Sequence, residues 1–442
     1  MRLRIARPKD IISTPVQYVP ALKNFRVRRS MRSVKILGNS KIRLKKSIFS
    51  VPGAKYFLYK NRFLACFLFA GIILGLLIRY RLLPFTSLDF WLDLNNWYDK
   101  IRNQGLSALR ADFSNYSPLY IYVLFFIHGL FPSLPNLLAV KFPSIFMDLV
   151  CASLAFGLIF SATRSKLRAA FACLSVFLAP TMIFNSAYWG QADVFYTSFL
   201  VLGIWLLISR RFSLAMLSYG VALAFKLQSV FLGPFIATLF LIGFIPWKQI
   251  FLIPVPYVIS IIPAWIAGRP VLQLLMIFWN QAGTYKRLTL NAASAYAWFF
   301  EDQYSLISKA GIFFAMGICL LFIAFIFFRK RKIGNGEIIL LATVSVFLVP
   351  FFLPSMHERY FYPADVFSIL VVFCYPELFL VPIFSQLSSF FTYQPFFTDK
   401  YVFPLSVISF LNLASIVFLA RKAIFLLYLQ KPLMKKKPLL HV

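Results

Sequence analysis

The stretch FLACFLFAGIILGLLIRYRLL, from Phe63 to Leu83, is apolar throughout except near its end, where Arg79 and Arg81 flank a tyrosine. As a helix it would be roughly 30 Å long, which matches the hydrocarbon core of a bilayer. Comparable runs recur along the chain and are continuously apolar, which favours helices over the alternating strands of a membrane barrel. The sequence therefore predicts an all-α, polytopic membrane protein with about twelve transmembrane helices.

Composition supports this class. Of the 442 residues, 60% are hydrophobic and 19% aromatic, and the mean hydropathy is +0.76, which excludes an ordinary soluble domain. We expect one transmembrane domain at 62–429, between a basic arm at 1–61 and a basic tail at 430–442. The arms lack the interleaved aromatics of nucleic-acid binders, so their predicted partner is anionic lipid on the cytosolic side. An Arg- and Ser-rich transit peptide is a second interpretation of the first arm.

The five cysteines lie within apolar runs and show neither metal-ligand nor disulfide spacing. No Walker A, GxGxxG or HExxH motif occurs, so the sequence suggests no cytosolic nucleotide donor and no metal or other cofactor.

Basic loops mark the cytoplasmic side of a membrane protein. The loops ATRSKLR (Ala162–Arg168) and RKRK (Arg329–Lys332) are therefore expected inside. This requires 84–136 to be one large external loop that carries two helices lying on the membrane. A further break at CYPE (Cys374–Glu377) returns the C-terminus to the cytoplasm.

With this orientation, the uncommon polar motifs all reach the external face. They are TSLDFWLDLNNW, YWGQAD, FKLQ, YKRLTLN and HER. Because the orientation rests on basic loops alone, this convergence predicts one composite site at the outer membrane boundary.

Asp89, in TSLDFWLDLNNW, is the candidate general base, because a carboxylate held against a membrane loses hydration and its pKa rises. A competing interpretation is that Thr86 and Asp89 form a capping box at the start of a surface helix. Asp93 lies one helical turn further on and is expected on a solvated face.

Residues suited to a sugar follow in two places. YWGQAD supplies an indole, an amide and a carboxylate, from Trp189, Gln191 and Asp193, which can stack on a sugar ring and bind its hydroxyls. Tyr116, in NYSPLY, and Gln228, in FKLQ, add further polar contacts. An interfacial aromatic belt, with Asp193 at the start of the next helix, explains the same residues without a ligand.

External cations run against the usual charge bias of membrane proteins and therefore indicate an anionic partner. Lys226, Arg287, His357 and Arg359 are the candidates for a phosphate. Local salt bridges to Glu301, Asp302 and Glu358 are the competing interpretation. We expect Glu358 to point away from the site and to pair locally.

These motifs resemble, in their order along residues 85–370, the GT-C superfamily of glycosyltransferases that use polyprenyl-phosphate sugars. The resemblance is to bacterial and eukaryotic relatives of the GPI-anchor second mannosyltransferase, and more distantly to the asparagine-glycan glucosyltransferases. It is carried by SLDFW, NYSPLY, KFPSIFMDL, NSAYWGQADVFY, FKLQSVFLGP, AGRP, YKRLTLNA and MHERYFYPAD. Ser117 stands where the related YPPL turn has its first proline.

The resemblance implies inverting transfer, of mannose in the nearest relatives, from a polyprenyl-phosphate donor to a hydroxyl of a glycan or glycolipid acceptor. It implies Asp89 as the base, the four cations on the phosphate and the YWGQAD residues at the sugar. The expected location is a bacterial plasma membrane with an external site, or an endoplasmic reticulum membrane with a luminal one. A transporter or flippase of lipid-linked sugars is the alternative, although it would call for internal repeats and midplane polar groups.

Overall fold

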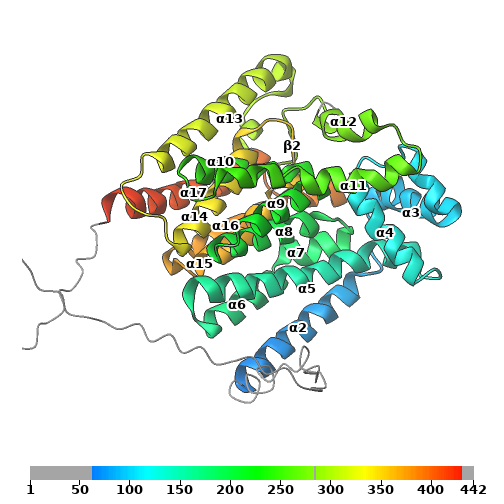
Figure 1. The fold of residues 1–442 in the computed structure, drawn as a ribbon, viewed down its shortest axis with the longest axis horizontal. Helices are drawn as coiled ribbons and strands as arrows, with labels where there is room; N and C mark the ends of the chain where they lie inside the picture. Colours follow the sequence, from blue (N-terminus) through cyan, green and yellow to red (C-terminus); the bar gives the residue numbers. More distant parts are fainter. Residues whose placement is uncertain (1–61, 283–284, 431–442) are drawn as a thin grey trace, which may run out of the picture. The chain divides into compact units, whose positions relative to one another are not determined.

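The computed structural model describes residues 62–282 and 285–430 (Figure 1). The predicted basic arm at 1–61 lies outside the described residues, as does the predicted tail from residue 431 onward. Helices dominate the described part, as the sequence predicts.

The α-helices are α2 (Arg62–Leu82), α3 (Asn95–Gln104), α4 (Pro118–Leu130), α5 (Asn136–Thr163), α6 (Lys166–Phe177), α7 (Pro180–Ile183), α8 (Asp193–Ile208), α9 (Phe212–Phe225), α10 (Gly233–Leu241), α11 (Val255–Ile266), α12 (Val271–Ala282), α13 (Tyr304–Phe327), α14 (Asn335–Phe352), α15 (Tyr362–Val372), α16 (Leu380–Thr398) and α17 (Leu405–Ile424). Short 3₁₀ and π turns are η1 (Phe90–Leu94), η2 (Gly105–Arg110), η3 (Phe184–Trp189), η4 (Leu227–Leu232), η5 (Trp247–Leu252), η6 (Ala295–Trp298), η7 (Glu301–Gln303), η8 (Glu358–Phe361), η9 (Pro376–Leu378) and η10 (Phe425–Leu429). The strands are β1 (Thr289–Leu290) and β2 (Met356–His357).

Six of the described helical segments are long and apolar enough to cross a membrane, and a bent pair formed by α6 with α7 and η3 makes a seventh. The six are Arg62–Leu82, Asn136–Thr163, Trp247–Ile266, Glu301–Phe327, Asn335–Phe352 and Leu405–Leu429. The first confirms the helix expected at Phe63–Leu83. These spans indicate an integral multi-pass membrane protein. The predicted twelve also counts shorter apolar helices, such as α8 and α9, which do not reach a full bilayer length by themselves.

Helix α8 lies at the centre of the bundle. Its sequence, DVFYTSFLVLGIWLLI, is apolar on all sides, which is typical of a helix surrounded by other helices. It packs against α5, α9, α14 and α15, and Figure 1 shows α5, α8 and α9 side by side. Because α8 begins at Asp193, this burial also fixes the end of the YWGQAD motif.

Three helix breaks, among them the one expected at CYPE, shape the chain around the site. At YWGQAD, η3 ends at Trp189 and Gly190 takes a φ of +82°, a left-handed conformation that favours glycine. At CYPE, α15 ends and η9 leads into α16. Between Phe352 and Tyr362, the PSMHERYF segment replaces helix by β2 and η8, and α15 begins at Tyr362 with Pro363 in its first turn.

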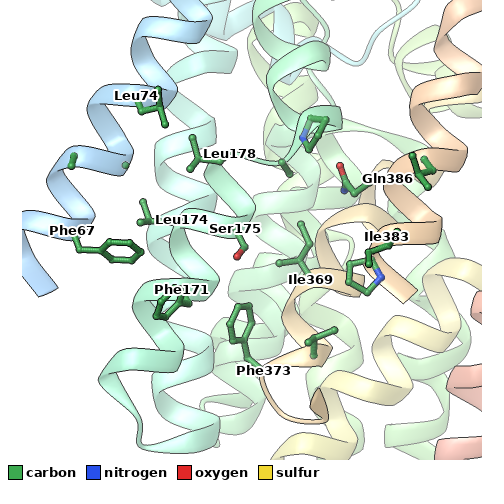
Figure 2. Close-up of a pocket in the computed structure, with 17 residues that line it drawn as sticks. Phe67, Leu74, Phe171, Leu174, Ser175, Leu178, Ile369, Phe373, Ile383 and Gln386 are labelled. Atoms are coloured by element: carbon green, nitrogen blue, oxygen red, sulfur yellow. The ribbon is translucent and has the colours of Figure 1, made fainter. Parts of the chain in front are cut away.

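A groove with a volume of about 880 Å³ runs among α2, α6, α15 and α16 (Figure 2). Phe67 of α2 meets Phe171 of α6 there, with ring centroids 5.0 Å apart. Its one amide, Gln386, accepts hydrogen bonds from the backbone N–H and the hydroxyl of Thr181 at 3.2 and 3.0 Å. The apolar lining suits hydrocarbon, and none of the predicted site residues lines this groove.

A buried ion pair joins α2 to the rest of the bundle. Arg79 Nε donates to Asp148 Oδ2 at 2.8 Å, and its Nη2 donates to the Phe177 carbonyl at 2.9 Å. Ser186 donates to the same aspartate oxygen at 2.5 Å. Lys141 also has a structural role, because its ammonium donates to the carbonyls of Leu83 and Phe85 just after α2. The Arg79–Asp148 ion pair and the Lys141 hydrogen bonds therefore hold α2 against α5.

Arg79→Ala should destabilise the protein by about 3–5 kcal/mol, because it leaves the buried Asp148 carboxylate without its cation. Thermal unfolding in detergent measures this loss. Arg81→Ala is the matched control, because Arg81 is exposed on the same helix end and should change stability little. Equal stability of the two variants would show that the Arg79 pair contributes nothing.

Candidate functional site

Asp89 is not a helix cap. The helical turn that follows α2 begins at Leu88, and Ser87 caps it by accepting a hydrogen bond from the Phe90 N–H at 3.2 Å. Ser87 also donates to the Trp189 carbonyl at 3.1 Å, and Asp89 makes no side-chain cap bond. The capping-box interpretation of Thr86 and Asp89 is therefore wrong, and the Asp89 carboxylate is directed to other partners.

One oxygen of Asp89 accepts three hydrogen bonds from three donors distant in sequence. Oδ2 lies 3.0 Å from Trp189 Nε1, 2.6 Å from Gln191 Nε2 and 2.8 Å from Arg359 Nη1. Tyr116 extends the network by donating its hydroxyl to Gln191 Oε1 at 3.0 Å. Within the described residues no hydrogen bond reaches Oδ1. The carboxylate is thus held by one oxygen, with the side chain 22% exposed.

Asp89 lines a cavity of about 250 Å³. Six of the ten residues predicted for the site line it, namely Asp89, Tyr116, Gln191, Arg287, His357 and Arg359. They come from the segment between α2 and α4, the YWGQAD break, the loop before β1 and the segment that includes β2 and η8. These six residues, which the sequence predicted to meet in one composite site, therefore line one cavity.

The other four predicted residues do not line this cavity. Trp189 is fully buried behind Asp89 and stacks on Phe396, with centroids 4.6 Å apart. Lys226 forms a salt bridge with the fully buried Asp193, so its charge is already paired. Gln228 is also buried, at 9% exposure. These residues support the wall of the site and do not form its surface.

Two acids were misjudged from the sequence. Glu358 does not point away from the site, because it lines the cavity at only 4% exposure. Asp93 also lines it, although a solvated helix face was expected, and burial followed by the nearby Asp89 raises its pKa. Its spacing of four residues from Asp89 on a helix was the available signal. Trp97, Asn115, Tyr285, Leu290, Asn291 and Phe396 also line the cavity and were not predicted.

Burial decides the charge of His357. Burial, together with the nearby cations of Arg359 and Lys226, lowers the pKa of this imidazole to about 3. Its Nδ1 lies 3.9 Å from Glu358 Oε2, too far for a hydrogen bond. At neutral pH His357 is therefore a neutral hydrogen-bonding group, and the expected cationic set at the cavity reduces to Arg287 and Arg359.

Two short strands fix the position of His357. β1 pairs with β2 in parallel, and Leu290 lies in register with His357. Ser355, with a φ of +62°, donates its N–H to the Leu288 carbonyl at 2.8 Å and its hydroxyl to the Arg287 carbonyl at 2.7 Å. The YKRLTLN and HER motifs thus form one unit, although about 65 residues separate them in the chain.

The salt bridges expected as a competing explanation for the predicted phosphate-binding cations are largely absent. In the part of the chain that the structure describes, neither Lys286 nor Arg287 forms an ion pair. Glu301 instead accepts the Leu288 N–H at 2.9 Å. Arg287 therefore reaches the cavity with its charge available for a ligand.

Comparison with protein-family models and with curated proteins adds no relative to this geometry. No protein-family model matches the chain, and no curated protein matches it.

The Glu358 carboxyl should make stability depend on pH. Burial raises its pKa to about 7, from 4.5. The folded state thus binds the proton more tightly than the unfolded state does. Protonation of Glu358 therefore stabilises the fold fully below pH 4.5, and this stabilisation is lost as the pH rises through about 7. Glu358→Gln should remove this slope and make the protein more stable than wild type at pH 8, by up to about 3 kcal/mol.

Thermal unfolding between pH 5 and pH 8 provides the test. Asp302→Asn, at an exposed acid outside the cavity, should keep the wild-type slope. A slope that persists in Glu358→Gln would assign the pH dependence to another group.

Proposed function

We propose that the protein is an inverting glycosyltransferase of the integral-membrane GT-C type. It would transfer a sugar, mannose by the sequence resemblance, from a polyprenyl-phosphate donor to an acceptor hydroxyl. The observation that carries the proposal is the Asp89 carboxylate, held through one oxygen at the edge of a polar cavity that also contains two arginines.

The Asp89 geometry suits a general base. Trp189, Gln191 and Arg359 engage Oδ2, which fixes the orientation of the carboxylate and leaves Oδ1 to accept a proton. A base needs to be within hydrogen-bond reach of the hydroxyl that it deprotonates, and a fixed orientation removes much of the cost of reaching that geometry. The 22% exposure of Asp89 gives a hydroxyl access to it.

The reaction would be a single displacement. The acceptor oxygen attacks the anomeric carbon while its proton passes to Asp89, and a new C–O bond forms. The bond from the anomeric carbon to the phosphate oxygen breaks, and the electron pair leaves with the polyprenyl phosphate. Because one carboxylate acts as a base and none as a nucleophile, the product has the inverted configuration.

The departing phosphate needs positive charge and hydrogen-bond donors. Arg287 offers a guanidinium without an ion pair among the described residues, and it lines the cavity together with Arg359 and the neutral His357. Arginine forks match phosphate oxygens, and electrostatic stabilisation of a leaving group is often the largest catalytic contribution. Lys226, already paired with Asp193, would support this wall without contacting phosphate.

The membrane setting of this proposal follows the basic loops. The site would lie at the external face of a bacterial plasma membrane, or at the luminal face of the endoplasmic reticulum, in a bundle of about twelve spans. A polyprenyl donor is itself membrane-borne, so its phosphate would arrive at the boundary where such a site lies. Its acceptor would be a glycan or glycolipid.

Asp89→Asn should lower the transfer rate by about 10²–10⁴-fold, because the amide accepts the same three hydrogen bonds but cannot take a proton. Incorporation of labelled sugar into membrane lipids measures this, with size-exclusion chromatography to show that the variant is folded. Asp99→Asn is the matched control, because Asp99 bonds to Asn95 and Asn136 outside the cavity. Full activity of Asp89→Asn would refute the assigned base.

Arg287→Gln should raise the KM for the polyprenyl-phosphate donor and lower kcat, because it removes a charge from both the bound and the departing phosphate. Steady-state kinetics with varied donor separates the two constants. Lys309→Gln, at an exposed lysine outside the cavities, should behave as wild type. Unchanged kinetics in Arg287→Gln would remove this residue from the phosphate site.

A further inference from the structure

A second polar cavity adjoins the first. Its volume is about 410 Å³, and its lining includes Lys286, Arg287, Thr289, Asn291, Glu301 and Tyr401. Arg287 and Asn291 line both cavities. The two spaces are therefore neighbours on either side of one segment of chain.

That segment is β1 with its flanks. Successive side chains of a strand point to opposite sides. Thr289 lines the second cavity, while Leu290, the next residue, lines the first. The strand is thus a partition between the two cavities, and its pairing with β2 and the bonds from Ser355 hold that partition in place.

The charge of the second cavity is unbalanced. Lys286 and Arg287 are exposed and make no ion pair in the described parts of the chain, 62–282 and 285–430. The cavity contains one carboxylate, Glu301, which accepts the Leu288 N–H at 2.9 Å. Thr289 and Tyr401 add hydroxyls, and the Tyr401 hydroxyl donates to Asn291 Oδ1 at 2.5 Å. Two cations with hydroxyl and amide groups form a chemical environment for an anion attached to a sugar or glycerol.

Exposed aromatic side chains occur in the segments that contribute Glu301 and Tyr401 to this cavity. Phe300 is 77% exposed, Tyr401 54% and Phe403 45%, in the segments just before α13 and α17. Aromatic residues concentrate at the boundary between a membrane and water. These aromatics are compatible with a membrane boundary, where a cavity can receive either a soluble anion or a lipid headgroup.

We propose that this second cavity is a separate anion-binding site, in which Lys286 recognises a phosphate carried by the second substrate. The assignment of this phosphate to the acceptor rests on the proposed transferase function, whereas the proposal that the cavity binds a phosphate does not. Lys286 lines only the second cavity and His357 only the first, so single variants can distinguish the two sites.

The test measures the thermal stabilisation of purified full-length protein, in nanodiscs of phosphatidylcholine, as inorganic phosphate is titrated against sodium chloride of equal ionic strength. Lys286→Gln should weaken the apparent phosphate affinity about tenfold, the loss of roughly one charge-assisted hydrogen bond. His357→Ala should retain the Lys286-dependent response. Lys309→Gln, outside both cavities, should match wild type.

Two further probes separate the sources of the phosphate. A response to glucose 6-phosphate that exceeds the response to glucose supports a soluble sugar phosphate. If the headgroup of phosphatidylglycerol occupies the cavity, added phosphate should no longer stabilise wild-type protein in nanodiscs that contain this lipid. In Lys286→Gln, phosphatidylglycerol should leave the remaining phosphate response unchanged. An identical phosphate response in Lys286→Gln and wild type, or no response beyond that of chloride, overturns the proposal.

Asp89→Asn distinguishes this proposal from the transferase. The variant should keep the full Lys286-dependent phosphate response, because Asp89 lies in the other cavity. If the wild-type protein shows this phosphate response but transfers no sugar, the anion-site proposal stands and the transferase proposal fails.

Discussion

The ion pair between Asp89 and Arg359 joins residues that are 270 positions apart, at an N···O distance of 2.8 Å. The same carboxylate oxygen accepts from Trp189 and Gln191, which come from a third part of the chain. A carboxylate with 22% exposure would be costly without these partners, because burial penalises an unpaired charge. The segment between α2 and α4, the YWGQAD break and the HER segment are therefore held at one point, and the cavity exists because they meet there.

Similar pairing recurs deeper in the bundle, where charge is more expensive. Arg79 and Asp148 are both fully buried, and Lys226 neutralises the fully buried Asp193. In a bilayer, each such group needs a partner because water is scarce. These pairs are structural, whereas Arg287 reaches both cavities without an ion pair among the described residues. That contrast separates the cations that hold the fold from those available to a ligand.

The sequence was informative where local chemistry decides the outcome. Continuous apolar runs predicted the helices, and CYPE marked a break that the structure contains between α15 and α16. It could not supply what depends on packing between distant segments. The charge of His357 depends on its burial beside Arg359 and Lys226, and the inward position of Glu358 depends on the turn that follows β2. Likewise, the pairing of Lys226 with Asp193 needed the contact between α8 and the end of α9.

The central claim is that one fixed carboxylate activates an acceptor hydroxyl for a single displacement. The most direct measurement is the anomeric configuration of the product, determined by NMR after purified protein in nanodiscs is supplied with polyprenyl-phosphate mannose and a membrane lipid extract. We predict release of polyprenyl phosphate in an amount equal to the new glycoside, with the configuration inverted relative to the donor. Retention of configuration, or no consumption of donor by folded wild-type protein across several acceptor extracts, would contradict this account.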